Sequence, residues 1–467
     1  MTDDSAATLK LMQNKPYRGW VLGLFVMITI FGFADRQIVS VLGQPIKRDL
    51  GLTDTEFGWL SGFAFALLNS LLAVPIARLA DRGRRVTLVG VGVMIWTLAT
   101  AACGLAHGFV QLLVSRLFVG LGEATGAPAT ASIIADYYPR EKRTSAMGVF
   151  SLAIPLGSML GFTGGGYIAQ HYDWRTAFLL AGAPGVLLAL LLFLTVREPL
   201  RGHYDPPPAT LTDTPPFLDV LRRIVEKPAF LHTLLGSTLV SVGGFGIISF
   251  NAQFFFRRFS LNYAQAGLLT GLITSVPACL CILAAGIMAD RLGRKDARFY
   301  GWVPALGAFL AAPFYIIAFL QHGWVATVVM LTVTGLVQYA YLPVSNGVYA
   351  NLMEPRMRAS ATAVVGMCTN LVSAGLGPLL VGMLSDAFAG HVFAQAGGQP
   401  FSIACAHGRA AETASAGACG QASATGLTWA CIVFALMYLW GGVHFMLAAR
   451  TLRRDMAQAP PEDAAVA

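Results

Sequence analysis

Residues 80–85 read ADRGRR and residues 289–295 read ADRLGRK, so one charged segment occurs twice in the chain. Each copy directly follows an apolar stretch of about the length that crosses a membrane. Five identical residue pairs, beginning with Pro128 and Pro343, recur further along, and the members of each pair are 215 residues apart. A repeat on this scale predicts two related halves that follow one another in the same order along the chain.

The composition indicates a membrane protein. Of the 467 residues, 55% are hydrophobic and 12% are charged, whereas soluble domains average about 25% charged residues. Apolar stretches of about 20 residues, the length needed to cross about 30 Å of hydrocarbon, recur throughout. We predict an all-α polytopic membrane protein with 12 transmembrane helices in two six-helix pseudo-repeat bundles. The expected spans are 20–41, 57–76, 86–106, 109–134, 146–168, 176–196, 230–254, 264–288, 300–320, 324–349, 359–384 and 425–447.

The positions of lysine and arginine predict the orientation. With a cytoplasmic N-terminus, 24 of the 32 lie in tails and inner loops, as the positive-inside rule requires. Both termini are therefore expected in the cytoplasm, and no nucleic-acid partner is expected. The Ala-rich and Gly-rich sequence is typical of a bacterial protein, so we expect the chain in a bacterial inner membrane. The expected domains are a tail at 1–19, a bundle at 20–196, a linker at 197–229 with a short helix at Phe217–Glu226, a bundle at 230–449 with a long periplasmic loop at 385–424, and a tail at 450–467.

Two of the seven cysteines differ from the rest in their surroundings. Five lie inside apolar spans, where cysteine is usually a small packing residue, and no cysteine shows metal-ligand spacing. Cys405 and Cys419 both fall in the predicted periplasmic loop, on the side where disulfides persist. A disulfide between these two residues is therefore a hypothesis. No metal and no cofactor is expected.

Four ionisable residues lie deep in predicted spans: Asp35, Arg36, Arg116 and Glu123. Unpaired, four such charges would cost on the order of 10 kcal/mol, so they need partners or water. At about 1.5 Å per residue, Asp35 and Arg116 lie at similar depths, roughly 8 and 10 Å below the outer boundary. We expect a cluster in which Asp35 and Glu123 exchange protons while Arg36 and Arg116 tune their pKa values. The alternative is an ion network that only orients spans one and four.

Two further groups of residues are candidates for gating and for substrate contact. An acid at a helix end can hold cationic side chains and close the cytoplasmic side, although plain charge anchoring is the alternative. The gate candidates are Asp81, Arg82, Arg85, Asp290, Arg291 and Arg294. Aromatic and amide groups in the second half are typical of a cavity for an amphipathic molecule. The alternative for each of them is a position that faces lipid or a neighbouring helix. The cavity candidates are Phe250, Asn251, Phe254, Tyr339, Asn346, Thr369 and Asn370.

Several stretches together resemble a known family. They are FADR at 33–36, RLFVGLGEA at 116–124, ADYYP at 135–139, IPLG at 154–157, DWR at 173–175 and REPLRG at 197–202. Together with the repeated charged loop, whose first copy is one residue short before its glycine, they resemble the major facilitator superfamily and, within it, the spinster-type transporters. The resemblance covers most of the N-terminal half, whereas the C-terminal half matches mainly at superfamily level.

The resemblance implies a proton-coupled secondary transporter of an amphipathic, lipid-like molecule, working by alternating access between the two halves and driven by the proton gradient. A monomer is expected. An organic-anion/proton symporter and a drug/proton antiporter of the same superfamily remain alternatives. An enzyme or receptor is disfavoured because the chain has no HExxH or GxSxG motif and no sizeable soluble domain.

Overall fold

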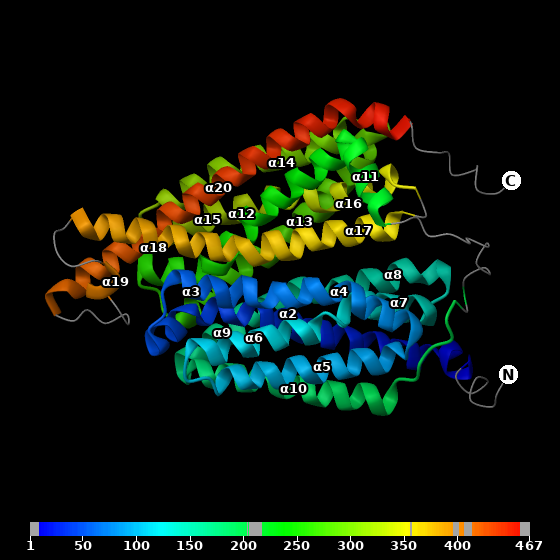
Figure 1. Cartoon of the computed structure of the whole chain (residues 1–467), viewed down its shortest axis with the longest axis horizontal. Helices are drawn as coiled ribbons and strands as arrows, with labels where there is room; N and C mark the ends of the chain where they lie inside the picture. The colour runs from blue at the N-terminus through cyan, green and yellow to red at the C-terminus, as the bar shows by residue number, and fades with distance from the viewer. Residues whose placement is uncertain are drawn as a thin grey trace. The chain divides into compact units, whose positions relative to one another are not determined.

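The computed structural model of the protein describes residues 9–202, 204, 217–354, 357–395, 401–405 and 413–457. All regular elements in these residues are helices, which confirms the predicted all-α class (Figure 1). The chain forms two compact units: unit 1 comprises Met1–Leu211 and Leu261–Gly271, and unit 2 comprises Thr212–Ser260 and Leu272–Ala467. Each unit corresponds closely to one half of the sequence repeat.

Unit 1 is a bundle in which helices far apart in the sequence pack against one another, as α2 does against α9 and α5 against α10. Its elements are α2 (Lys15–Leu50), α3 (Asp54–Gly58), the π-helical turn η1 (Trp59–Phe63), α4 (Ala64–Arg82), α5 (Arg85–Gly104), α6 (Phe109–Glu123), α7 (Gly126–Tyr137), α8 (Arg140–Ser151), α9 (Ala153–His171) and α10 (Trp174–Thr195).

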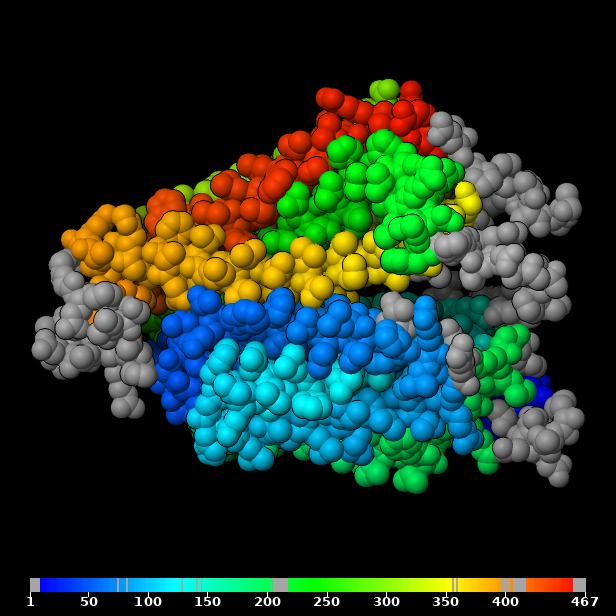
Figure 2. Space-filling model, viewed as in Figure 1, coloured from blue at the N-terminus to red at the C-terminus, as the bar shows by residue number. Residues whose placement is uncertain are grey.

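Unit 2 is built in the same way, with α12 packed against α20. The segments α17, η2 and α18 follow one another as a continuous rod, yellow to orange in Figures 1 and 2. Its elements are α11 (Phe217–Glu226), α12 (Pro228–Phe259), most of α13 (Tyr263–Gly293), α14 (Phe299–Leu320), α15 (Trp324–Gln338), α16 (Tyr341–Leu352), α17 (Arg358–Met367), the π-helical η2 (Cys368–Leu376), α18 (Gly377–Gln395), α19 (Phe401–Ala404) and α20 (Thr413–Ala457).

In the described residues, 11 helices are long and apolar enough to cross a membrane. The predicted fourth span is not among these 11, and α6 and α7, which are separated by a turn at Ala124 and Thr125, together cover it. The short helix expected in the linker is confirmed, since α11 runs from Phe217 to Glu226 and buries Val220 and Ile224 in the core of unit 2.

Local sequence signals explain where several helices begin and end. Asn14 caps α2 with Pro16 at its first turn, and Gly51 ends it with a positive φ of 69°, a conformation that glycine adopts without strain. Thr53 and Glu56 form a capping box on α3, and Asp173 caps α10 by accepting from the Thr176 N–H at 2.6 Å. That hydrogen bond holds the pKa of Asp173 below its usual value.

Glycines bring the α2 and α9 backbones into direct contact. A Cβ added at Gly157 would meet the carbonyl of Ile30, and one at Gly161 would meet the backbone of Ala34. Small residues commonly permit this close approach between membrane helices. The contact lies next to Asp35, so it helps to set the position of that buried acid.

We expect Gly161→Ala to lower the stability of the protein by about 1–3 kcal/mol, because the backbone of Ala34 cannot move aside as a flexible side chain could. The measurement is thermal unfolding of the purified protein in detergent, followed by size-exclusion chromatography. Gly164→Ala is the matched control, since its new Cβ would meet only Leu160, at 3.8 Å. Equal melting temperatures for the two variants would contradict the close-packing argument.

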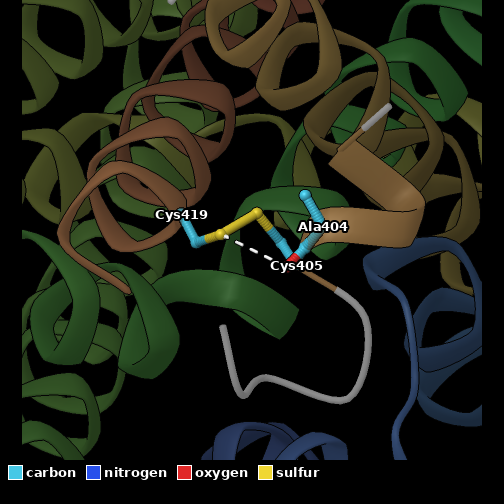
Figure 3. Close-up of a disulfide and its surroundings, with 3 residues drawn as sticks. All are labelled: Ala404, Cys405 and Cys419. Atoms are coloured by element: carbon cyan, nitrogen blue, oxygen red, sulfur yellow. Dashed lines mark hydrogen bonds between the residues drawn. A yellow bond between two sulfur atoms is a disulfide. The ribbon is translucent and has the colours of Figure 1, made fainter. Parts of the chain in front are cut away.

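The predicted periplasmic loop contains more helix than expected. Helix α18 continues to Gln395 and α20 begins at Thr413, well outside the predicted span limits. Alanine is abundant here and has the highest intrinsic helix propensity, which accounts for the extension. A disulfide joins Cys405, after α19, to Cys419 in α20, with the two Cα atoms 5.7 Å apart (Figure 3).

Candidate functional site

The four deep ionisable residues lie on two helices of unit 1. Asp35 and Arg36 are on α2, and Arg116 and Glu123 are on α6, so each helix contributes one acid and one base. Asp35, Arg116 and Glu123 are nearly inaccessible, with exposed fractions of 3%, 1% and 7%. The Arg36 side chain is 31% exposed. The structure thus brings all four predicted residues into one cluster with a single partly accessible member.

Asp35 and Arg116 form the inner pair of this cluster. Arg116 Nη1 donates to Asp35 Oδ2 at 3.2 Å, and Thr100 Oγ1 on α5 donates to Asp35 Oδ1 at 2.9 Å. Both oxygens of the buried carboxylate therefore have a partner. Pairing and hydrogen bonding of this kind offset the cost of burying the two charges.

Arg36 and Glu123 form the outer pair. Arg36 approaches Glu123 Oε2 through both Nε and Nη2. Its guanidinium also lies over the rings of Phe33 and Phe65, 4.9 and 4.6 Å from the ring centres, and the Arg116 guanidinium is 5.7 Å from the centre of Phe65. Phe65 therefore contacts both cations, an arrangement in which the ring face attracts positive charge.

The cluster retains one acceptor and one donor for which the described residues supply no hydrogen-bond partner. The acceptor is Glu123 Oε1 and the donor is Arg116 Nε, and both atoms are buried. Buried polar atoms are normally satisfied, so such exceptions often mark functional positions. A carboxylate with one bonded oxygen and one oxygen without a partner can take up a proton at the second oxygen. The loss of charge then weakens the contact made by the first oxygen, and this is the chemistry that the site permits.

A helix break directly follows Glu123. The Thr125 N–H donates to the Gly122 carbonyl at 3.3 Å, and α7 starts at Gly126. The same break occurs 215 residues later, where the Ala340 N–H donates to the Val337 carbonyl at 3.3 Å, between α15 and α16. The residue of unit 2 at the position equivalent to Glu123 is therefore Gln338.

Gln338 forms a neutral network in place of an ion pair. Its Oε1 accepts hydrogen bonds from Tyr315 at 2.5 Å and from Tyr438 at 2.9 Å, and all three side chains are buried. Sequence reasoning missed this residue, although the 215-residue spacing of the repeat points directly to it. The ionisable site is thus present in unit 1, and its counterpart in unit 2 carries an amide.

Of the predicted gate residues, Arg85 is the one placed in a buried network. It is 3% exposed and donates to Asp136 at 2.5 Å, to Glu198 at 2.9 Å and to Ser132 at 2.7 Å. Asp136 and Glu198 were missed as partners, although both lie in the stretches that carry the family resemblance. Arg201 Nη2 donates to the carbonyls of Ala80 and Gly83 at the end of α4.

The other gate candidates are not brought together in the described residues. The side chains of Asp81 and Arg82 lie outside the described part, and Asp290, Arg291 and Arg294 are exposed. The ion pair nearest the second charged loop is instead Asp296 with Arg453, at 2.8 Å. The Arg298 N–H and then Arg453 hold the pKa of Asp296 below its usual value.

The predicted cavity residues of unit 2 occupy different environments. Phe250 and Phe254 have no exposed surface, and the Phe254 ring packs edge-on against Phe319 at 5.0 Å, so in this structure these rings are core residues. Asn251 is also buried, and its Oδ1 lacks a partner among the described residues. Asn346 is exposed, whereas Tyr339, Thr369 and Asn370 are half-buried, the last two within the π-helical η2.

Two related six-span bundles, one of them with a buried ionisable cluster, define a polytopic membrane transporter. Residues 24–378 and 233–464 match the Major Facilitator Superfamily, and the chain belongs to that family. It is 32% identical, over 96% of its length and 96% of the relative, to an MFS-type efflux pump of Mycolicibacterium smegmatis.

Two further comparisons place the chain among spinster-type transporters. It is 32% identical to a bacterial homologue of the human lysosomal transporter spinster, whose crystal structure in an inward-facing, unoccupied conformation it matches with a TM-score of 0.87. That match covers 95% of this chain and 99% of the other. A protein of Arabidopsis thaliana named probable sphingolipid transporter spinster homolog 1 is 28% identical over 73% of this chain and 75% of its own length. The protein is a transporter, not an enzyme.

Proposed function

We propose that the protein is a proton-coupled secondary transporter of an amphipathic, lipid-like small molecule, working by alternating access between its two six-helix halves. The observation that carries the proposal is the Glu123 carboxylate, which is buried, bonded through Oε2 to Arg36 and open at Oε1. Protonation at Oε1 would remove the charge that holds Arg36. The protonation state of Glu123 would then decide whether the Arg36 guanidinium is available to bind a substrate.

Arg36 is the residue that can couple protonation of Glu123 to substrate binding. It is the partly exposed member of the cluster, and a guanidinium binds carboxylate or phosphate groups through paired hydrogen bonds. An anionic head group can therefore compete with Glu123 for Arg36, so that proton and substrate are coupled through one side chain. The relative named as a sphingolipid transporter supports a substrate with such a head and an apolar tail.

The location proposed for the chain is a bacterial inner membrane with both termini in the cytoplasm. The support is the distribution of lysine and arginine, 24 of 32 in the tails and inner loops of that orientation. The protein is proposed to work as a monomer with the proton gradient as its energy source.

The proposal is tested by flux of a labelled lysolipid into or out of proteoliposomes with an imposed pH gradient, with a small organic acid as competitor. We expect gradient-driven lysolipid flux that the organic acid does not inhibit. Gradient-driven flux of the organic acid without lysolipid flux would instead identify an organic-anion/proton symporter.

A drug/proton antiporter is the second candidate, because a relative 32% identical along nearly the whole chain is named an efflux pump. The same proteoliposomes can be loaded with a lipophilic cationic dye. Dye extrusion driven by the pH gradient, without lysolipid flux, would favour this candidate over the lipid-like substrate.

A further inference from the structure

Phe65 contacts both arginines of the ionisable cluster with one ring. The guanidinium carbon of Arg36 lies 4.6 Å from the ring centre, and that of Arg116 lies 5.7 Å from it. Both distances are within the range of about 6 Å in which a ring face attracts a cation. Two like charges beside one ring repel each other, and the negative face of the shared ring offsets part of that repulsion. The ring can therefore act on the ion cluster as well as fill space.

The fold fixes the position of Phe65 through its backbone. A Cβ added at Gly120 on α6 would lie 2.3 Å from the Phe65 carbonyl oxygen, so the two backbones are in direct contact. One turn further along α4, Asn69 Nδ2 donates to the Gly120 carbonyl at 3.4 Å. Gly120 lies between Arg116 and Glu123 on the same helix. The contact thus ties the ring to the helix that carries half of the cluster.

A π-helical turn directly precedes this part of α4. The turn η1 covers Trp59–Phe63, and the Ala64 N–H that follows it donates to the Trp59 carbonyl. The rings of Trp59 and Phe63 pack edge to face within the turn, with their centres 4.7 Å apart. A π-helical turn adds one residue, so it rotates the side chains that follow by about 100°, and such turns are frequent at functional sites. The turn therefore helps to decide which face of α4 Phe65 occupies.

The aromatic contacts of Arg36 become decisive once Glu123 is neutral. In the described part of the chain, the polar and aromatic contacts of Arg36 are the Glu123 carboxylate and the rings of Phe33 and Phe65. Protonation of Glu123 weakens the first contact and leaves both cation–π contacts in place. Because the Arg36 side chain is 31% exposed, a guanidinium without these contacts would turn toward water. The rings keep the guanidinium beside Glu123.

We propose that Phe65 is a positioning residue of the transport site, whose ring holds the Arg36 guanidinium in place for the anionic head group of the substrate while Glu123 is protonated. Phe33 shares the contact, but it lies on the same helix as Arg36, whereas Phe65 reaches the guanidinium from α4. The inference rests on the proposed function, in which Arg36 passes between Glu123 and the substrate. It adds to the coupling step a residue that carries no charge and binds no proton.

The first test needs no substrate. Purified Glu123→Gln protein represents the neutral state of this residue, and mass spectrometry follows the rate at which phenylglyoxal modifies Arg36. Phe65 is replaced in turn by mono-, di- and trifluorophenylalanine, which differ little in size, whereas the attraction of the ring face for a cation falls at each step. We expect the modification rate to rise at each step, about fivefold in total, which corresponds to about 1 kcal/mol.

The control is the same fluorinated series at Phe25, a fully buried ring of the apolar core of unit 1. Fluorination of this ring should leave the modification rate of Arg36 unchanged. Equal rates throughout the Phe65 series would overturn the proposal, because a ring that only fills space is indifferent to fluorination.

The second test measures flux of labelled lysophosphatidylglycerol, an anionic lysolipid, in proteoliposomes with Glu123 intact. The lysolipid concentration that gives half-maximal flux should rise about fivefold from phenylalanine to trifluorophenylalanine at position 65, with the maximal flux unchanged. Gradient-driven flux with the same half-maximal concentration throughout the series would overturn the role of Phe65 alone. A wild type without gradient-driven flux would contradict the proposed function, and the modification rates of Arg36 would then still decide whether Phe65 holds it.

Discussion

Glu123→Gln is expected to abolish the dependence of substrate transport on the pH gradient while leaving the protein folded. Two pH units supply about 2.7 kcal/mol per proton, enough for roughly hundredfold accumulation of substrate if one proton moves with each molecule. The glutamine variant cannot bind that proton, so its accumulation ratio should fall to about one. The measurement is the steady-state ratio of labelled lysolipid across the proteoliposome membrane.

The fold should tolerate Glu123→Gln because unit 2 already has a glutamine at the equivalent position. At the equivalent helix break, 215 residues later, the chain has Gln338 in a buried network with Tyr315 and Tyr438. The break therefore needs no carboxylate. Exchange of labelled for unlabelled substrate without a gradient should continue in the variant, and Glu226→Gln on α11, whose side chain is 44% exposed, should behave as wild type. Retained gradient-driven accumulation in Glu123→Gln would exclude this residue as the coupling site.

The spans and the inner ion pair could be predicted because their signals are local. A span needs a fixed length of apolar sequence, and depth along two helices placed Asp35 level with Arg116, which are bonded in the structure. Depth could not predict the outer pair, because Glu123 lies seven residues beyond Arg116. At about 1.5 Å per residue, this places Glu123 roughly 10 Å deeper than Arg116 and well below Arg36. The Arg36 side chain is long enough to bridge this difference in depth. A depth calculated from the number of residues along a helix does not include the length of a side chain.

The cavity residues of the C-terminal half could not be predicted from the sequence, for a different reason. Core and cavity positions both avoid lipid, so hydrophobic periodicity cannot tell a packed ring such as Phe254 from one that would touch substrate. The gate region shows the same limit, since three basic residues closely follow each acid. They are Arg82, Arg84 and Arg85 after Asp81, and Arg291, Arg294 and Lys295 after Asp290. Which arginine becomes buried depends on acids supplied from elsewhere, here Asp136 and Glu198 for Arg85.

Arg116→Leu is expected to be the most destabilising single substitution in the cluster. It leaves Asp35 buried, with Thr100 as its remaining direct partner, and breaking a buried pair from one side costs about 3–5 kcal/mol. The apparent melting temperature in detergent should fall by several degrees. Arg116→Lys is the matched variant that keeps a positive charge on α6, and it should lose less stability.

The double variant Asp35→Asn/Arg116→Leu separates a structural cost from a role in transport. With the acid neutralised, no buried charge is left without a partner, so most of the stability lost in Arg116→Leu should return. If the pair served only to orient α2 and α6, this stable double variant would also recover gradient-driven transport. We expect it to fold and yet remain impaired, because Asp35 and Arg116 set the electrostatic environment in which Glu123 holds or releases its proton. Full recovery of transport would assign the inner pair to the fold alone.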